Sequence, residues 1–111
     1  MVTLTLQYFT PWIPGEKNVL SFNLSAGLPA GVTLTGTPAV TASTYIGTDT
    51  NPSAILNGSA SLDSTSTIVL VPAAVVNDQN QYLISVICGT TNPDIVLGLA
   101  GVLPVNSQSG A

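Results

Sequence analysis

The sequence predicts an all-β protein, a single antiparallel β-sandwich of about seven or eight strands. Short segments with alternating polar and apolar residues recur along the whole 111-residue chain, separated by Gly, Pro, Asn and Asp. Hydrophobic residues make up 45% of the chain, which is enough to form a core. No window shows the 3.6-residue spacing of an amphipathic helix, so evenly spaced strands in two packed sheets are the expected architecture.

The first half of the chain contains four candidate strands. The first ends at residues 10–15, because the prolines there cannot donate hydrogen bonds to a neighbouring strand. In the second, the alternation places Leu20, Phe22 and Leu24 toward the core. The four candidates are residues 2–9, 19–25, 32–35 and 39–45.

The second half contains four more candidate strands. One of them includes the step Asn57-Gly58, which suits either a hairpin turn or a bulge. The four candidates are residues 54–62, 67–71, 81–88 and 95–105. Residues 1–105 are therefore expected to form one domain, and residues 106–111 a polar tail that frays.

The last two candidate strands are apolar on both faces. One face of residues 82–88 carries four core candidates, and the other carries Leu83 and Ile87. A sandwich strand normally has a polar outer face, so we expect the second apolar face to be covered. A second subunit and loops of the same chain are both possible covers. The four core candidates are Tyr82, Ile84, Val86 and Cys88.

Reactive side chains are scarce, and the sequence predicts no enzyme and no catalytic residue. The chain has no His and no Arg, one Lys (Lys17), one Cys (Cys88) and five carboxylates. Proton transfer in enzymes uses paired groups within hydrogen-bonding reach, whereas these carboxylates are scattered singly. A thiol also needs a nearby base to become a nucleophile, so Cys88 is expected to be a small core residue.

The same composition predicts no metal, cofactor, nucleic acid or membrane. Zinc requires clustered His and Cys, and calcium requires several gathered oxygen ligands, whereas Asp49, Asp63 and Asp78 stand alone. The net charge of −4 with a single Lys opposes binding to phosphates or to an anionic bilayer. The longest apolar run, residues 95–105, contains two Gly and a Pro and is too short to cross a bilayer.

An aromatic cluster near the start of the chain has two interpretations. Tyr8, Phe9 and Trp12 lie within five positions, next to prolines. Aromatic residues of this kind are enriched at the centres of protein interfaces. They also serve as core plugs where a strand passes between two sheets. Together with Leu83 and Ile87 they form the candidate interface.

Two segments carry a family resemblance. Residues 14–28, PGEKNVLSFNLSAGL, have a Pro and an acidic residue ahead of an aromatic-polar-apolar strand, and residues 81–91, QYLISVICGTT, begin a strand with Tyr-x-Ile. With Leu103-Pro-Val105 at the end, they resemble the fiber–tail adaptor proteins of tailed phages, which are small immunoglobulin-like sandwiches of the virion neck. The family often has a Trp on the strand after its first hairpin, where this chain has residues 37–40, TPAV.

The resemblance implies an immunoglobulin-like sandwich and a structural role in the virion. Its partners would be a neck or tail ring, a fiber or a capsid protein, and the chain would be a homo-oligomer in the particle, without catalytic residues. Residues 1–7 lack the features of a signal peptide, so we expect synthesis in the host cytoplasm, or a mature form numbered from Met1. The alternatives are a capsid decoration protein and a carbohydrate- or surface-binding module, in which Tyr8, Trp12 and Tyr45 would stack on sugars.

Overall fold

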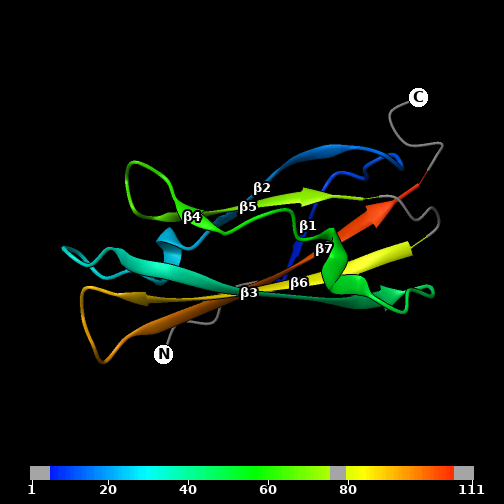
Figure 1. Cartoon of the computed structure of the whole chain (residues 1–111). Coiled ribbons are helices and arrows are strands. Elements are labelled where there is room, and N and C mark those ends of the chain that lie inside the picture. Colours follow the sequence, from blue (N-terminus) through cyan, green and yellow to red (C-terminus); the bar gives the residue numbers. More distant parts are fainter. Residues whose placement is uncertain (1–5, 76–79, 107–111) are drawn as a thin grey trace.

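The computed structural model describes residues 6–75 and 80–106, which form two β-sheets packed face to face (Figure 1). One sheet has the strand order β1-β7-β6-β3 and the other β2-β5-β4. The strand pairs are antiparallel except that β1 runs parallel to β7. The predicted all-β class is therefore confirmed. The strands are β1 (Gln7–Tyr8), β2 (Lys17–Asn23), β3 (Leu34–Ile46), β4 (Ser61–Leu62), β5 (Ile68–Ala74), β6 (Asn80–Thr90) and β7 (Val96–Val105).

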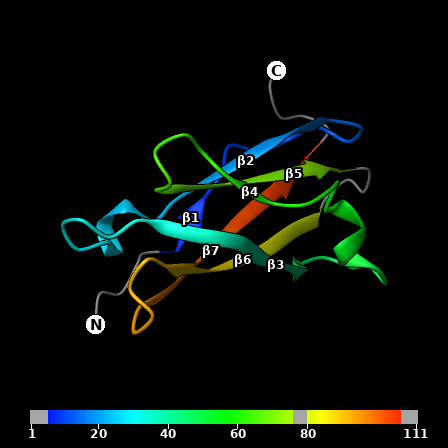
Figure 2. The ribbon, with the colours of Figure 1, turned by 60° about the vertical axis from the view of Figure 1, so that its left-hand side comes forward.

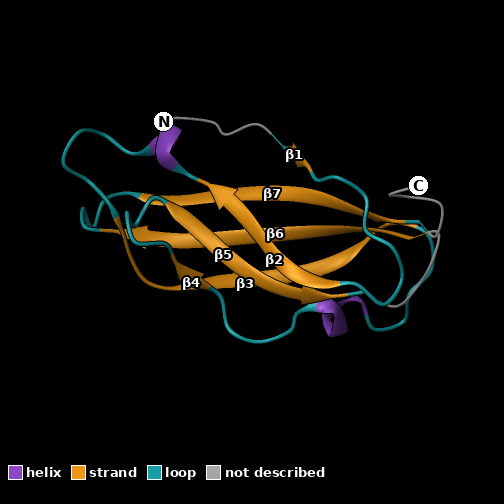
Figure 3. Ribbon diagram, turned by 90° about the horizontal axis from the view of Figure 1, so that it is seen from above, coloured by secondary structure: helices purple, strands orange, loops and turns teal. Residues whose placement is uncertain are grey.

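The two sheets form separate layers that cross at an angle. Seen from above, β2 and β5 run diagonally over the strands of the four-stranded sheet (Figure 3). The same two layers remain distinct after the molecule is turned by 60° (Figure 2). Twisted sheets pack in this way because each strand carries a right-handed twist. One face of each sheet is thereby buried and the other is turned outward.

The core lies between the layers and follows the alternation of the sequence. Leu20, Phe22 and Leu24 are buried, as predicted for the second candidate strand. On β6 the inward positions are also buried, and the predicted core role of Cys88 is confirmed, since it is 2% exposed. Alternate residues of one strand point to opposite faces, so the remaining positions of β6 define the outer face. The buried residues of β6 are Asn80, Tyr82, Ile84, Val86, Cys88 and Thr90.

Two predicted strands are in fact one. Residues 34–35 of the third candidate and all of residues 39–45 belong to β3, whose register on β6 shifts between Thr35 and Ala39. Gly36 has a φ of 79°, a left-handed conformation that glycine adopts without a steric penalty. The chain can therefore bulge at this point and continue as the same strand.

The prediction of a strand at residues 54–62 is wrong for most of that segment. Pro52–Ile55 form a 3₁₀ helix with the proline in its first turn, and the strand β4 covers only Ser61–Leu62. A proline suits the first turn of a helix because the backbone donor it lacks has no partner there anyway. Gly58, with a φ of 112°, lies in the connecting loop and forms neither a hairpin turn nor a bulge in a ladder. The other 3₁₀ helix is Ser25–Gly27.

A buried polar cluster ties the loop after β3 to the start of β6. The Tyr82 hydroxyl donates a 2.6 Å hydrogen bond to Oδ2 of Asp49. The Asn80 side chain accepts a hydrogen bond from the backbone N–H of Thr48 and donates one to its carbonyl oxygen, both at 3.1 Å. Buried polar groups of this kind are stable because they are paired. Residues 2–5 of the first predicted strand, Asp78 and residues 107–111 of the predicted tail lie outside the described residues.

Candidate interaction surface

The aromatic cluster divides between the core and the surface. Trp12 is 7% exposed and belongs to the hydrophobic core, so the core interpretation holds for this residue. Its backbone N–H donates to the carbonyl oxygen of Pro104, and its carbonyl oxygen accepts from the N–H of Asn106, both at 2.9 Å. Residues 9–12 therefore run along the end of β7, which places the indole between the two sheets.

Phe9 is also used mainly for packing within the molecule. Its ring is half-buried and meets the ring of Phe22 edge to face, with centroids 5.1 Å apart and an interplanar angle of 77°. The ring lies over Gly101, where an added Cβ would come within 2.5 Å of the Phe9 ring. A glycine at this position lets β1 approach β7 closely. Phe9 thus attaches the start of the chain to the core.

Tyr8 and Tyr45 form a bridge across the outer face of the four-stranded sheet. Tyr8 pairs with Val102 of β7, which pairs with Leu83 of β6, so all three lie on that face. The nearby side chain of Tyr45 raises the pKa of the Tyr8 hydroxyl, which places the two hydroxyl groups close to each other. Their strands lie three spacings apart, about 14 Å, so both rings must reach toward each other across β7 and β6. We call this pair the tyrosine bridge.

Beside the tyrosine bridge, apolar side chains of β6 and β7 are shielded from solvent, whereas Ile46 of β3 is 53% exposed. Val102 is fully buried although it points away from the sandwich core. Leu83 is half-buried, whereas Tyr8 remains 64% exposed above them. At this end, side chains of the same chain cover the second apolar face of β6 and β7.

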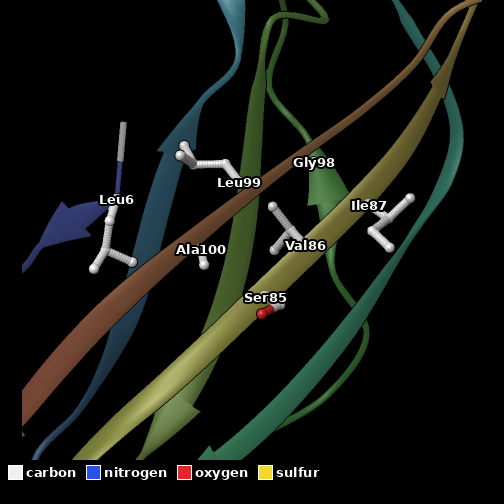
Figure 4. A pocket seen from close by; sticks show the side chains of 7 residues that line it. All are labelled: Leu6, Ser85, Val86, Ile87, Gly98, Leu99 and Ala100. Carbon is white, nitrogen blue, oxygen red and sulfur yellow. The ribbon is translucent and has the colours of Figure 1, made fainter. Parts of the chain in front are cut away.

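At the other end of the outer face, no side chain among residues 6–75 and 80–106 covers the apolar residues. Ile87 is 55% exposed and Val96 is 63% exposed, and both lie on outward positions of paired strands. Beside Ile87 the surface sinks into a shallow pocket of about 320 Å³. Its floor is made by the small residues Ser85, Gly98 and Ala100, and Figure 4 shows Leu6 and Ile87 on opposite sides of it. We call Leu6, Ser85, Ile87, Val96, Gly98 and Ala100 the open patch.

No charged residue lies on the outer face of the four-stranded sheet in the described part of the chain. The described charges are placed at strand ends and in loops instead. The outward residues that pair across β3, β6 and β7 are Thr35, Ala39, Thr41, Ser43, Ile46, Gln81, Leu83, Ser85, Ile87, Gly89, Val96, Gly98, Ala100, Val102 and Pro104. The described charges are Glu16, Lys17, Asp49, Asp63 and Asp94.

The isolated acids and the thiol have structural surroundings. Oδ2 of Asp63 accepts a 2.6 Å hydrogen bond from the Thr65 hydroxyl, and Oδ1 accepts the backbone N–H groups of Thr67 and Ile68. These bonds lower the pKa of the Asp63 carboxyl, the Thr65 hydroxyl most of all. Burial raises the pKa of the Cys88 thiol. Within residues 6–75 and 80–106, no three His, Cys, Asp or Glu side chains gather to hold a metal ion.

The five residues predicted as an interface are thus divided. Trp12 and Phe9 pack inward, Leu83 lies half-buried at the covered end, and Tyr8 and Ile87 are exposed. The floor of the open patch was not predicted, because a small residue taken singly does not indicate a surface. The alternation of Gly98 and Ala100 with the buried Leu97 and Leu99 of β7 is the pattern that would have indicated it.

No similarity to a known protein bears on the role of this surface. No helix in the described residues is long and apolar enough to span a bilayer. No protein-family model, no curated protein and no solved structure matches the chain.

Proposed function

We propose that this chain is a structural protein of a tailed-phage virion, an immunoglobulin-like adaptor at the neck or tail that links fiber or ring proteins. The observation that carries an assembly role is the uncharged outer face with its open patch. Exposed apolar surface without charges favours association with another protein. Ile87 and Val96, more than half exposed, would gain by burial at about 25 cal/mol per Å². The placement in a phage particle rests on the sequence resemblance.

The strand order supports the immunoglobulin-like part of the proposal. In that fold, strands B, E and D form one sheet and C, F and G the other. With β2 taken as strand B, the three-stranded sheet follows B-E-D and the sequence β7-β6-β3 follows G-F-C. The hydroxyl of Tyr82, at the start of β6, bonds to Asp49, similar in place to the tyrosine of strand F in that fold. The chain differs in having one cysteine and in placing β1 beside β7.

Binding to incomplete particles tests the adaptor role. Purified chain would be mixed with phage particles that lack it and sedimented, with intact particles as the control. We expect the chain to sediment with the incomplete particles only, and Ile87→Asp to weaken this binding. Equal recovery with both kinds of particle, or none with either, would contradict the proposal.

A carbohydrate- or surface-binding module is the second candidate, and capsid decoration is a variant of the first. The two rings of the tyrosine bridge favour the second candidate, since exposed aromatic side chains can stack on sugars. Trp12 lies in the core and cannot belong to such a platform. Glycan binding that is lost in Tyr8→Ala and in Tyr45→Ala, and kept in Ile87→Asp, would favour this function over assembly.

A further inference from the structure

We propose that the open patch is the contact of a two-fold homodimer, in which Ile87 of each copy enters the shallow pocket of the other. The proposal rests on the assembly role proposed above and specifies its surface and its occupant, a second copy of this chain.

The shape of the patch is self-complementary. Ile87 projects from β6 with 55% of its surface exposed. The pocket beside it has a volume of about 320 Å³ and a floor of small side chains. In Figure 4 the Ile87 side chain lies at one side of this floor and Leu6 at the other. A branched apolar side chain and a hollow lined by Gly98 and Ala100 thus lie next to each other on one surface.

A two-fold axis would bring the Ile87 side chain of each copy opposite the pocket of the other copy. In a two-fold interface, residue i of one copy meets residue j of the other, and j meets i. An axis that lies in the interface, midway between Ile87 and the pocket, brings each Ile87 over the pocket of the partner copy. Because the pocket begins on the neighbouring strand, where Gly98 pairs with Ile87, the two insertions lie side by side.

The distribution of charge permits two copies to meet on this face. The net charge of −4 would normally oppose self-association. The described charges, however, lie at strand ends and in loops, and the outward residues of the four-stranded sheet have none. The single described cation is Lys17, at the start of β2 in the opposite layer. A partner with a basic or acidic surface would therefore find no complement here, whereas a second neutral face would.

The area of the face suits a weak dimer. The three long strands β3, β6 and β7, spaced about 4.8 Å apart, are about 14 Å wide, whereas the described part of β1 adds two residues. The 10 residues of β7 at about 3.4 Å each span about 34 Å, so the planar area is about 490 Å² per copy. Interfaces that bury less than about 1,200 Å² in total are typical of weak, reversible association. The exposed outer sides of Tyr8 and Tyr45 would lie within the same contact.

The mass of the purified full chain in solution tests the dimer. Light scattering or sedimentation across a range of concentrations should give 11.2 kDa at high dilution and twice that mass at high concentration. Ile87→Asp should raise the dissociation constant at least about 30-fold, as expected for a central interface residue. Val19→Asp is the matched control, because Val19 is 50% exposed on the opposite sheet, and it should leave the dissociation constant unchanged.

A second variant distinguishes a specific contact from non-specific association. Ala100→Leu adds apolar surface but fills the pocket floor. It should weaken the dimer at least about tenfold if Ile87 enters the pocket, whereas non-specific association would become stronger. Circular dichroism and thermal unfolding of each variant show that the fold is kept.

Three results would overturn the proposal. These are a monomer at all concentrations, a discrete oligomer larger than two, and equal effects of Ile87→Asp and Val19→Asp. The particle assay distinguishes this failure from that of the proposed function. A monomer that still binds incomplete particles refutes the dimer alone. A dimer disrupted by Ile87→Asp in a chain that binds no particle refutes the virion role alone.

Discussion

The thiol of Cys88 is enclosed on the inner face of β6. It is 2% exposed, its Sγ–H donates to the carbonyl oxygen of Thr35 at 3.5 Å, and burial raises its pKa. A raised pKa keeps the thiol protonated near neutral pH, and only the thiolate is nucleophilic. We expect Cys88 to react with an aromatic disulfide reagent at least about 100-fold more slowly in the native chain than in denaturant. Equal rates in the two states would show that the side chain is accessible.

Asp63 makes the turn between β4 and β5 sensitive to pH. Its carboxylate accepts hydrogen bonds from the Thr65 hydroxyl and from two backbone N–H groups, which lower its pKa below the ordinary 3.8. Because the folded pKa is the lower one, this stabilisation is fully present above the unfolded pKa and is lost as the pH falls through the folded pKa.

Two variants of this turn test the pH dependence. We expect the parent chain to be more stable than Asp63→Asn at neutral pH, and the difference to shrink once the pH falls below 3.8. Denaturant unfolding at several pH values measures it. Thr65→Val removes the strongest of the hydrogen bonds and should show a weaker pH dependence than the parent. A difference that is constant with pH would show that the charge of Asp63 contributes nothing to stability.

At the scale of elements, β1 is attached by a close contact rather than by length. Its described part pairs through two residues, and Phe9 packs into the space above Gly101 and against Phe22. Gly101→Ala should lower the free energy of unfolding by about 1–3 kcal/mol, because the new methyl group displaces the Phe9 ring. In a Phe9→Ala background the same substitution should cost less, and a double-mutant cycle measures the difference. Additive effects would mean that the two residues do not compete for this space.

The elements also show where local sequence signals were insufficient. The core alternation of Leu20, Phe22 and Leu24 was predictable, because a strand buried on one face repeats every two residues. The continuity of β3 through Gly36 was not, since a glycine marks a turn and a bulge alike. The 3₁₀ helix at Pro52–Ile55 was also hidden, because a segment of four residues is too short for a helical period.

For the whole molecule, the single core predicts cooperative unfolding. Trp12 and Cys88 both belong to one hydrophobic cluster that joins the two sheets. We expect Trp12 fluorescence and Cys88 reactivity to report the same unfolding midpoint, as in a two-state transition. Trp12→Ala should cost about 3–5 kcal/mol, so it would test folding rather than binding. Separate midpoints for the two probes would indicate that the ends of the sandwich unfold independently.

The candidate surface was predictable only in part. The alternation on residues 82–88 identified Leu83 and Ile87 as a second apolar face. It could not show that the tyrosine bridge lies over one end of that face, because Tyr8 and Tyr45 are far apart in the chain and meet across two intervening strands. Side chains of the same chain therefore cover this face at Val102, and a second copy of the chain is the proposed cover at Ile87.

The sequence by itself determined the all-β class, the inward residues of β2 and β6, and the near absence of reactive groups, because each depends on composition or on a two-residue period. Only the tertiary structure decided which apolar residues stay exposed. Trp12 and Ile87 are both large and apolar, yet one is 7% and the other 55% exposed. Burial depends on which strands lie side by side, and this pairing joins residues that are distant in the chain.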